Sequence, residues 1–249
     1  GQKMNISKRG IEIQESPIRK LKPYADKAIA AGVRVYFINI GQPDIVTPQP
    51  VWDAFKNCQD KVLSYGPAQG FQDLRQAIAD YFTGYNIDLN AENVLITVGG
   101  SEAIQFAFNV VSDPGEEIII PEPFYTNYNG YESSANVKIV PLTLNVADGF
   151  RLPPAEEIEA KISDKTKAIL LCSPNNPTGT VYTAEELDRI VNLAKKYDLF
   201  LIADEVYKEF VYDGATHKSI LEYDEIHDRA IVVDSISKRF SCCGARIGA

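Results

Sequence analysis

The chain has 249 residues, of which 45% are hydrophobic and 24% are charged. This mixture is typical of a soluble globular protein and argues against a disordered, collagen-like or coiled-coil chain. No run approaches the roughly 18 consecutive apolar residues of a membrane-spanning helix, and the first residues lack the apolar centre of a secretory signal. A formal net charge of -9 also argues against binding to nucleic acid or to anionic membranes.

The cysteines and histidines give no sign of a metal site. The four cysteines fit no zinc-binding spacing, and without a secretory signal we expect reduced thiols in a cytosolic protein. The two histidines, His217 and His227, have no Cys or carboxylate at ligand spacing. They offer little basis for a metal centre or for a Ser-His-Asp triad.

Helical and strand-like patterns alternate along the chain. A helical pattern over 17–31 follows Ser16, and Pro23 indicates that the helix starts or kinks there. A short apolar run then occupies 35–40, and a second helical pattern covers 71–83. The later part has β-type apolar runs at 94–98, 117–120, 137–140, 168–172, 199–203 and 230–233, and helical patterns at 101–111, 154–163 and 184–197.

Several of these strands are apolar throughout, which is typical of strands buried on both faces. The sequence therefore predicts an α/β fold, a three-layer αβα domain with a mostly parallel sheet, preceded by an N-terminal helical segment. Ligands of such sheets bind where the strands end at their carboxyl termini. We therefore expect the functional residues in the segments directly after the strands.

Each strand end carries polar or aromatic residues that suit one part of a single ligand. Gly99, Gly100 and Ser101 stand at a helix start, where backbone N–H groups can form an anion cradle. The end of the chain adds further hydroxyls and an arginine. The residues expected to bind the anion are Gly100, Ser101, Ser235, Ser237 and Arg246. Tyr125 offers a face for a flat ring. Asp204, ending a buried strand, needs a cation or a protonated ring nitrogen, and Lys238 is an amine that reacts with an aldehyde. Together these groups describe pyridoxal 5′-phosphate.

The motifs that contain these residues resemble those of class I/II aminotransferases, which are fold-type I pyridoxal-phosphate enzymes of the aspartate aminotransferase kind. They stand in the order found in that family, and the resemblance covers essentially the whole chain. The motifs are GQPD at 41–44, YGPAQG at 65–70, GGSEA at 99–103, PFY at 123–125, PNNPTG at 174–179, ADEVY at 203–207, SISK at 235–238 and GARIG at 244–248.

The resemblance implies a role for each residue. Lys238 would form the Schiff base and transfer the proton, and Asp204 would keep the pyridine nitrogen protonated. Asn176 and Tyr207 would bond the phenolic oxygen, Tyr125 would stack on the ring, and the cradle with Arg246 would hold the phosphate.

Two further roles concern the substrate and a second subunit. Gly41 and Asn176 would lie at the substrate, with Gly41 near its carboxylate. Tyr65 would reach the phosphate of the neighbouring subunit in a homodimer with shared active sites. The chain departs from the family at Ala245, where many relatives have an aromatic residue, and at Cys242-Cys243.

The resemblance also implies that relatives continue well beyond the last motif, with closing strands and a small domain that supplies the arginine for the substrate α-carboxylate. We therefore expect 1–45 to be an N-terminal segment belonging to the small domain or arm. We expect 46–249 to be a truncated cofactor-binding large domain, inactive by itself.

The function implied is transfer of an amino group between an L-amino acid, aspartate-like or of broad choice, and a 2-oxo acid. A carbon–sulfur β-lyase using the same cofactor is the alternative reaction. A non-catalytic ligand-binding module is the alternative of another class, although only about 16 residues precede the first helical pattern, too few for an upstream DNA-binding domain.

Overall fold

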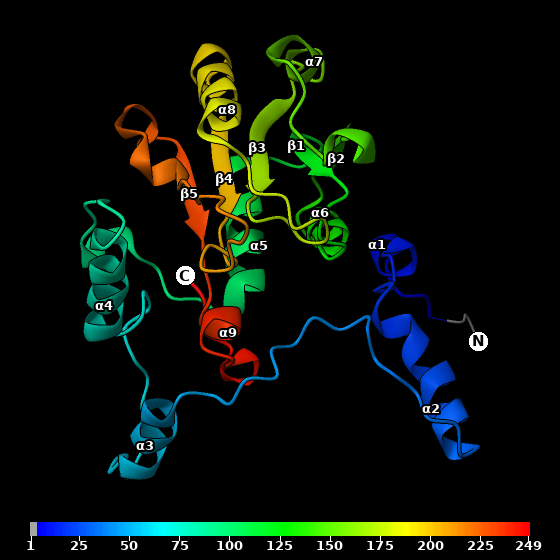
Figure 1. Ribbon diagram of the computed structural model, residues 1–249, viewed down its shortest axis with the longest axis vertical. Coiled ribbons are helices and arrows are strands. Elements are labelled where there is room, and N and C mark those ends of the chain that lie inside the picture. The colour runs from blue at the N-terminus through cyan, green and yellow to red at the C-terminus, as the bar shows by residue number, and fades with distance from the viewer. Residues whose placement is uncertain (1–3) are drawn as a thin grey trace.

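A computed structural model describes residues 4–249 (Figure 1). Its helices are α1 (Lys8–Glu12), α2 (Lys22–Ala30), α3 (Gln49–Asn57), α4 (Gln72–Thr83), α5 (Gly99–Val111), α6 (Tyr128–Ala135), α7 (Ala155–Glu159), α8 (Ala184–Tyr197) and α9 (Ile236–Arg239). Its strands are β1 (Glu117–Glu122), β2 (Lys138–Thr143), β3 (Thr166–Cys172), β4 (Phe200–Asp204) and β5 (Ala230–Val233). Short 3₁₀ turns, including η1 (Arg19–Leu21), connect several of these elements.

The five strands form one sheet in the order β2-β1-β3-β4-β5, and every neighbouring pair is parallel. The carboxyl ends of all strands therefore lie along the same edge of the sheet. Parallel pairs need crossover connections, and helices supply most of them here. This confirms the predicted α/β fold with a mostly parallel sheet.

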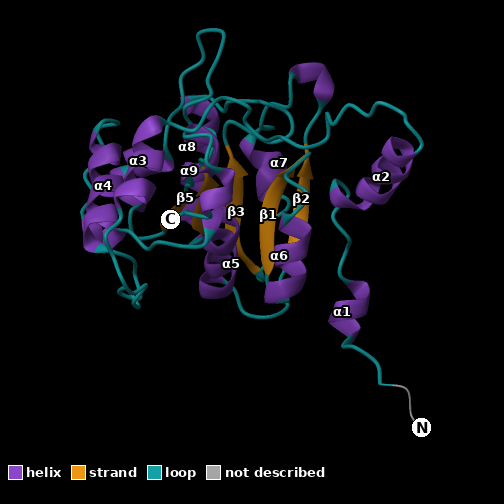
Figure 2. Cartoon of the chain, turned by 90° about the horizontal axis from the view of Figure 1, so that it is seen from below, coloured by secondary structure: helices purple, strands orange, loops and turns teal. Residues whose placement is uncertain are grey.

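Helices cover both faces of the sheet (Figure 2). Ile118 and Ile120 of β1 pack with α5 and α6 on one face, whereas Ile119 packs with α7 and α8 on the other. Side chains of a strand alternate between faces, so a strand covered on both sides must be apolar at every position. The continuous apolar runs in the sequence have this origin.

One expected strand is not a regular strand. Residues 94–98 form no ladder, and only Thr97 makes an isolated antiparallel bridge, to Gly248. The Thr97 N–H donates to the Gly248 carbonyl at 2.8 Å, and the Gly248 N–H returns a bond of 2.9 Å. A strand forms only where a neighbouring strand pairs with it, and among residues 4–249 this run makes only the one bridge to Gly248.

The predicted helix bounds need three changes. The helix expected over 17–31 begins as the turn η1 and becomes α-helical at Lys22, with Pro23 in its first turn, as the proline indicated. The helix expected over 154–163 ends at Glu159, and the one expected at 101 starts at Gly99. The helix over 184–197 is confirmed, with a capping box between Thr183 and Glu186.

The N-terminal segment, residues 4–48, runs beside the sheet domain and passes below α9 (Figure 1). Few side chains attach it. Thr47 Oγ1 donates to the Ser241 carbonyl at 2.5 Å, and Arg9 reaches the Ser134 carbonyl at 3.5 Å. The apolar run over 35–40 is not a strand, and Ile38 in it is 96% exposed.

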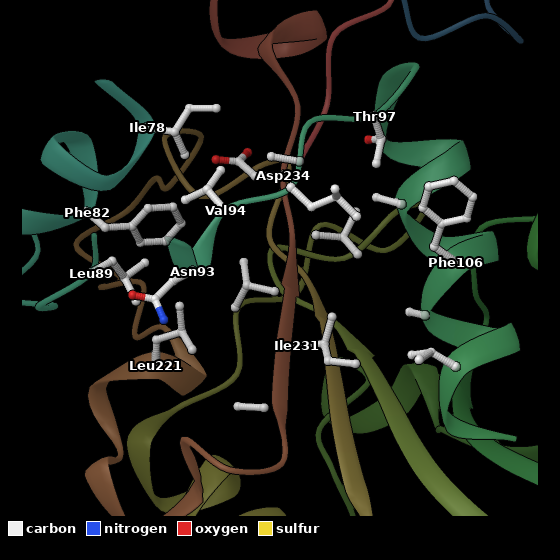
Figure 3. A pocket seen from close by; sticks show the side chains of 18 of the residues that line it. Ile78, Phe82, Leu89, Asn93, Val94, Thr97, Phe106, Leu221, Ile231 and Asp234 are labelled. Atoms are coloured by element: carbon white, nitrogen blue, oxygen red, sulfur yellow. The ribbon is translucent and has the colours of Figure 1, made fainter. Parts of the chain in front are cut away.

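Two further features of the described part bear on function. No helix in residues 4–249 combines the length and apolar character needed to cross a membrane. A cavity of about 740 Å³ lies beside β5, between α4 and α5. Apolar side chains such as Phe82, Phe106 and Ile231 make up most of its wall, as Figure 3 shows.

A substitution in the interior strand β4 tests how far the sheet core determines the stability of the fold. Ile202 is fully buried there, so Ile202→Ala is expected to reduce the free energy of unfolding by about 2–5 kcal/mol, because the lost contacts leave a cavity. Urea denaturation measures the change. The control is Val146→Ala, at a position 72% exposed, which should change it by less than about 0.5 kcal/mol. Equal effects of the two substitutions would contradict this account of the core.

Candidate active site

The loops at the carboxyl edge of the sheet surround a second cavity, of about 550 Å³. It draws on segments far apart in the sequence, from the N-terminal arm to the last residues. Eleven of the twelve residues predicted for the site line it: Gly41, Gly100, Ser101, Tyr125, Asn176, Asp204, Tyr207, Ser235, Ser237, Lys238 and Arg246. These predicted residues therefore meet at the edge of the sheet where ligands of parallel sheets bind.

Tyr65 is the exception. It lies in the loop between α3 and α4, its side chain is fully exposed, and it does not line the cavity. Its predicted role is in the site of a neighbouring subunit, so that role stays a prediction.

One end of the cavity gathers hydrogen-bond donors of the kind that can hold an anion. Gly100 and Ser101 lie in the first turn of α5, where backbone N–H groups have no helical acceptor. Ser235 caps α9, accepts a bond from the Ser237 N–H at 3.1 Å and places its hydroxyl 2.8 Å from that of Ser237. These donors converge on one region and suit a phosphate.

Arg246 completes this end. Its Nη1 donates to the Cys243 carbonyl at 2.9 Å, and no carboxylate of residues 4–249 forms an ion pair with it. The backbone at Gly99 has a φ of +72°, and a Cβ there would overlap the Arg246 guanidinium. Glycine is therefore required at 99 for the arginine to lie against the start of α5.

Asp204 stands at the end of β4 with its carboxylate buried. The Tyr128 hydroxyl donates to it at 2.7 Å, and the Val206 N–H lies at 3.4 Å. Across residues 4–249 it has no salt bridge to a Lys, Arg or His. Burial raises its pKa to about 6, against the lowering effect of the Tyr128 bond. A buried carboxylate without a cation fits the protonated ring nitrogen of pyridoxal 5′-phosphate.

Lys238 lies in α9, half-buried at the cavity wall. Its Nζ donates to the Gly41 carbonyl at 2.7 Å and is 3.9 Å from Cys243 Sγ. Gly41 belongs to the N-terminal segment, so the fold brings together two predicted site residues separated by 197 positions in the sequence.

Two tyrosines and an asparagine, Tyr125, Tyr207 and Asn176, also line the cavity. Burial raises the pKa of Tyr207 and of Tyr125 to about 12, so both phenols stay protonated donors. The loop that carries Asn176 is held by its neighbour, since Asn175 Nδ2 donates to the Pro123 carbonyl at 3.1 Å and to Thr178 Oγ1 at 2.7 Å. These two bonds attach the loop to the end of β1 and to its own turn.

The sequence analysis did not identify the residues that hydrogen-bond to Asp204 and Asp234 and hold the site in place. Tyr128 on α6 is one, because its contact with Asp204 spans 76 positions and leaves no local pattern. Asp234 is another: it accepts two bonds from Arg239, at 2.6 and 2.7 Å, and one of 2.9 Å from the buried Lys208. These ion pairs fix the turn that carries Ser235 and Lys238. Asp234 and Arg239 are five residues apart, and this spacing is the sequence feature that could have indicated their ion pair.

Comparison with known proteins assigns the family. The sequence model described as aminotransferase class I and II matches residues 35–249. The chain belongs to this family. The geometry of the cavity agrees with that membership, since the residues that carry the motifs meet at one edge of the sheet.

Similar proteins include enzymes named for different substrates. The aspartate aminotransferase of Pyrococcus horikoshii is 34% identical, over 98% of this chain and 61% of its own length. The aromatic-amino-acid aminotransferase 2 of Thermococcus litoralis is 34% identical, over 98% and 62%. A solved aspartate aminotransferase of Thermus thermophilus, a double mutant, superposes with a TM-score of 0.91 at 31% identity, over 99% of this chain and 64% of its own. The chain thus spans about three-fifths of these relatives.

The acidic, cysteine and histidine side chains of the described part are scattered. Within residues 4–249, no group of three or more His, Cys, Asp or Glu side chains is placed to hold a metal ion. His217 instead lies 3.4 Å from the buried Glu205, which also accepts a bond of 2.9 Å from Ser219.

The raised pKa of Asp204 predicts a stability cost that depends on pH. Its carboxyl binds a proton more tightly in the fold, so the native state loses stability as pH rises from about 4 to about 6, and the loss stays constant above that. Asp204→Asn keeps an acceptor for Tyr128 and removes the charge. Without cofactor, the variant is expected to be more stable than the wild type at pH 8, by up to about 3 kcal/mol, and equally stable near pH 4.

Thermal unfolding at the two pH values measures this difference. The matched control is Asp164→Asn, an exposed aspartate, which should show no such dependence. A variant that is destabilised at pH 8 would overturn the description of Asp204 as a buried, uncompensated charge.

Proposed function

We propose that this chain carries the cofactor-binding part of a pyridoxal 5′-phosphate-dependent aminotransferase, and that residues 46–249 are its large domain and 1–45 an arm. The observation that supports this most is the meeting of Lys238, Asp204 and the anion cradle in one cavity. An amine, a buried carboxylate without a cation, and a phosphate cradle are the three groups that this cofactor requires.

When bound, pyridoxal 5′-phosphate supplies an aldehyde that condenses with amines and a ring that accepts electrons. In the proposal, Lys238 Nζ holds the cofactor and moves the proton at the substrate Cα. Asp204 keeps the ring nitrogen protonated. Asn176 and Tyr207 donate to the phenolic oxygen, and Tyr125 covers one face of the ring.

The substrates proposed are an L-amino acid and a 2-oxo acid. Gly41 lies beside Lys238, within 2.7 Å of its Nζ through the carbonyl, which supports its placement near the substrate carboxylate. Asn176 lines the same cavity. Relatives with similar identity are named for aspartate and for aromatic amino acids. Their names therefore do not identify the side chain of this protein's substrate.

A homodimer with shared active sites is also proposed. The N-terminal half exposes many large apolar side chains, which is unusual for a surface that stays in water; they include Met4, Tyr24, Ile38, Val46, Leu63 and Tyr65. A second subunit would cover them and would receive Tyr65 at its phosphate. A cytosolic location stays a prediction.

Lys238→Ala tests the proposal. Removing the amine is expected to abolish covalent retention of the cofactor and its visible absorbance, and to reduce amino-group transfer by several orders of magnitude. Borohydride reduction of the wild type followed by peptide mapping should place the cofactor on the peptide that contains residue 238. The control is Lys196→Ala, a lysine on the exposed side of α8, which should leave all three readouts unchanged.

The product distinguishes the transferase from the lyase. The transferase needs a 2-oxo acid as acceptor, whereas a β-lyase releases pyruvate, ammonia and thiocysteine from cystine without one. Absorbance and covalent labelling that persist in Lys238→Ala would remove the basis for both reactions and favour a binding module.

A further inference from the structure

The adjacent cysteines at 242 and 243 have no role in the proposed function. Cys242 is buried, whereas Cys243 is half-buried and lines the cavity together with Lys238 and Arg246. Cys172 lines the same cavity from the end of β3. The site therefore holds thiols close to the amine on which the proposed chemistry depends.

The thiol of Cys243 lies directly beside the amine of Lys238. Lys238 Nζ donates to Cys243 Sγ over 3.9 Å, and the thiol itself donates to the Ser237 carbonyl at 3.3 Å. The backbone holds this arrangement, because the Cys242 N–H donates to the same Ser237 carbonyl at 3.0 Å. Arg246 Nη1 also donates to the Cys243 carbonyl at 2.9 Å. Two nucleophiles five positions apart thus face each other across the turn that follows α9.

The other thiols of the chain lie in different surroundings. Burial raises the pKa of the Cys172 thiol well above its usual value, so this thiol stays protonated and unreactive. Cys242 is buried as well. Cys58 is exposed at the end of α3 and does not line the cavity. Cys243 is therefore the thiol that joins access from the cavity to contact with an amine.

A thiol next to an amine has a defined oxidation chemistry. The thiol sulfur attacks one oxygen of hydrogen peroxide, the O–O bond breaks, and the thiol proton leaves with the released hydroxide as water. The sulfur loses two electrons to the peroxide and becomes a sulfenic acid. A nearby nitrogen then attacks this sulfur, so that an S–N bond forms and the S–O bond breaks. The hydroxyl leaves as water with a proton from the amine, and this second step needs no further oxidant.

We propose that Cys243 and Lys238 form a reversible covalent switch, in which peroxide oxidises the thiol and the amine then closes an S–N bond. The flexible four-carbon stem of the lysine allows its Nζ to cross the remaining distance to the sulfur. The bond consumes the amine that the proposed function requires, and it blocks attachment of the cofactor. A free thiol reverses it by attacking the sulfur and returning the amine, and a second thiol reduces the mixed disulfide left behind.

Peptide mapping of the whole chain after treatment with hydrogen peroxide tests the switch. Cleavage after arginine should give peptides 230–239 and 240–246 joined through residues 238 and 243, lighter than their sum by two hydrogen atoms. Dithiothreitol should separate the pair. Cys243→Ser and Lys238→Ala should each abolish it. The control is Cys58→Ser, at the exposed thiol outside the cavity, which should leave the yield of the pair unchanged.

Other oxidation products would overturn the inference. A disulfide inside peptide 240–246, between Cys242 and Cys243, is one such product, and a disulfide between Cys243 and Cys172 is another. Oxidation of Cys243 to a sulfenic or sulfinic acid with no bond to residue 238 would also overturn it, because the amine would then not reach the sulfur.

Added pyridoxal 5′-phosphate separates the switch from the proposed function. In the proposed function the cofactor occupies Lys238, so it should prevent the S–N bond when peroxide is applied in its presence. A chain oxidised beforehand should show little cofactor absorbance until dithiothreitol returns the amine. If the bond forms equally with and without cofactor, the switch stands and the proposed attachment at Lys238 fails. If no bond forms but borohydride still attaches the cofactor at residue 238, the attachment stands and the switch fails.

Discussion

The common direction of the five strands is the constraint on which the rest of the structure depends. Since every pair is parallel, all carboxyl ends meet at one edge, and the loops that follow them must share one space. Helices on both faces bury the strands. The cavity with Lys238, Asp204 and the cradle on α5 is a direct consequence. The larger cavity beside β5 lies along a strand rather than at a strand end, and apolar side chains make up most of its wall.

A second consequence is the cost of ending a buried strand with a carboxylate. Burial raises the pKa of Asp204 to about 6, and the Tyr128 hydroxyl offsets only part of this effect. Beside it, Asp234 is held by two cations, Lys208 and Arg239. The contrast is informative: one aspartate is fully compensated within the fold and serves the architecture, whereas the other is left without a cation. Such uncompensated groups mark binding sites, where a ligand supplies the missing charge.

The N-terminal segment contributes to the site through few contacts. The bond from Lys238 to the Gly41 carbonyl and those between Thr47, Ser241 and Ile45 attach it beneath α9. Its apolar side chains are largely exposed. A segment held by a few hydrogen bonds moves more readily than the sheet.

The sequence by itself determined the fold class, most strand and helix positions, and eleven of the residues that line the cavity. It did so because strands buried on both faces must be continuously apolar, and because turns at strand ends require particular glycine, proline and polar residues. The tertiary structure alone decided that 94–98 has no partner strand, that Tyr128 bonds Asp204, and that Arg19 enters the cavity. These are contacts between distant segments. Their energy depends on neighbours that no local pattern records, so only the packed chain reveals them.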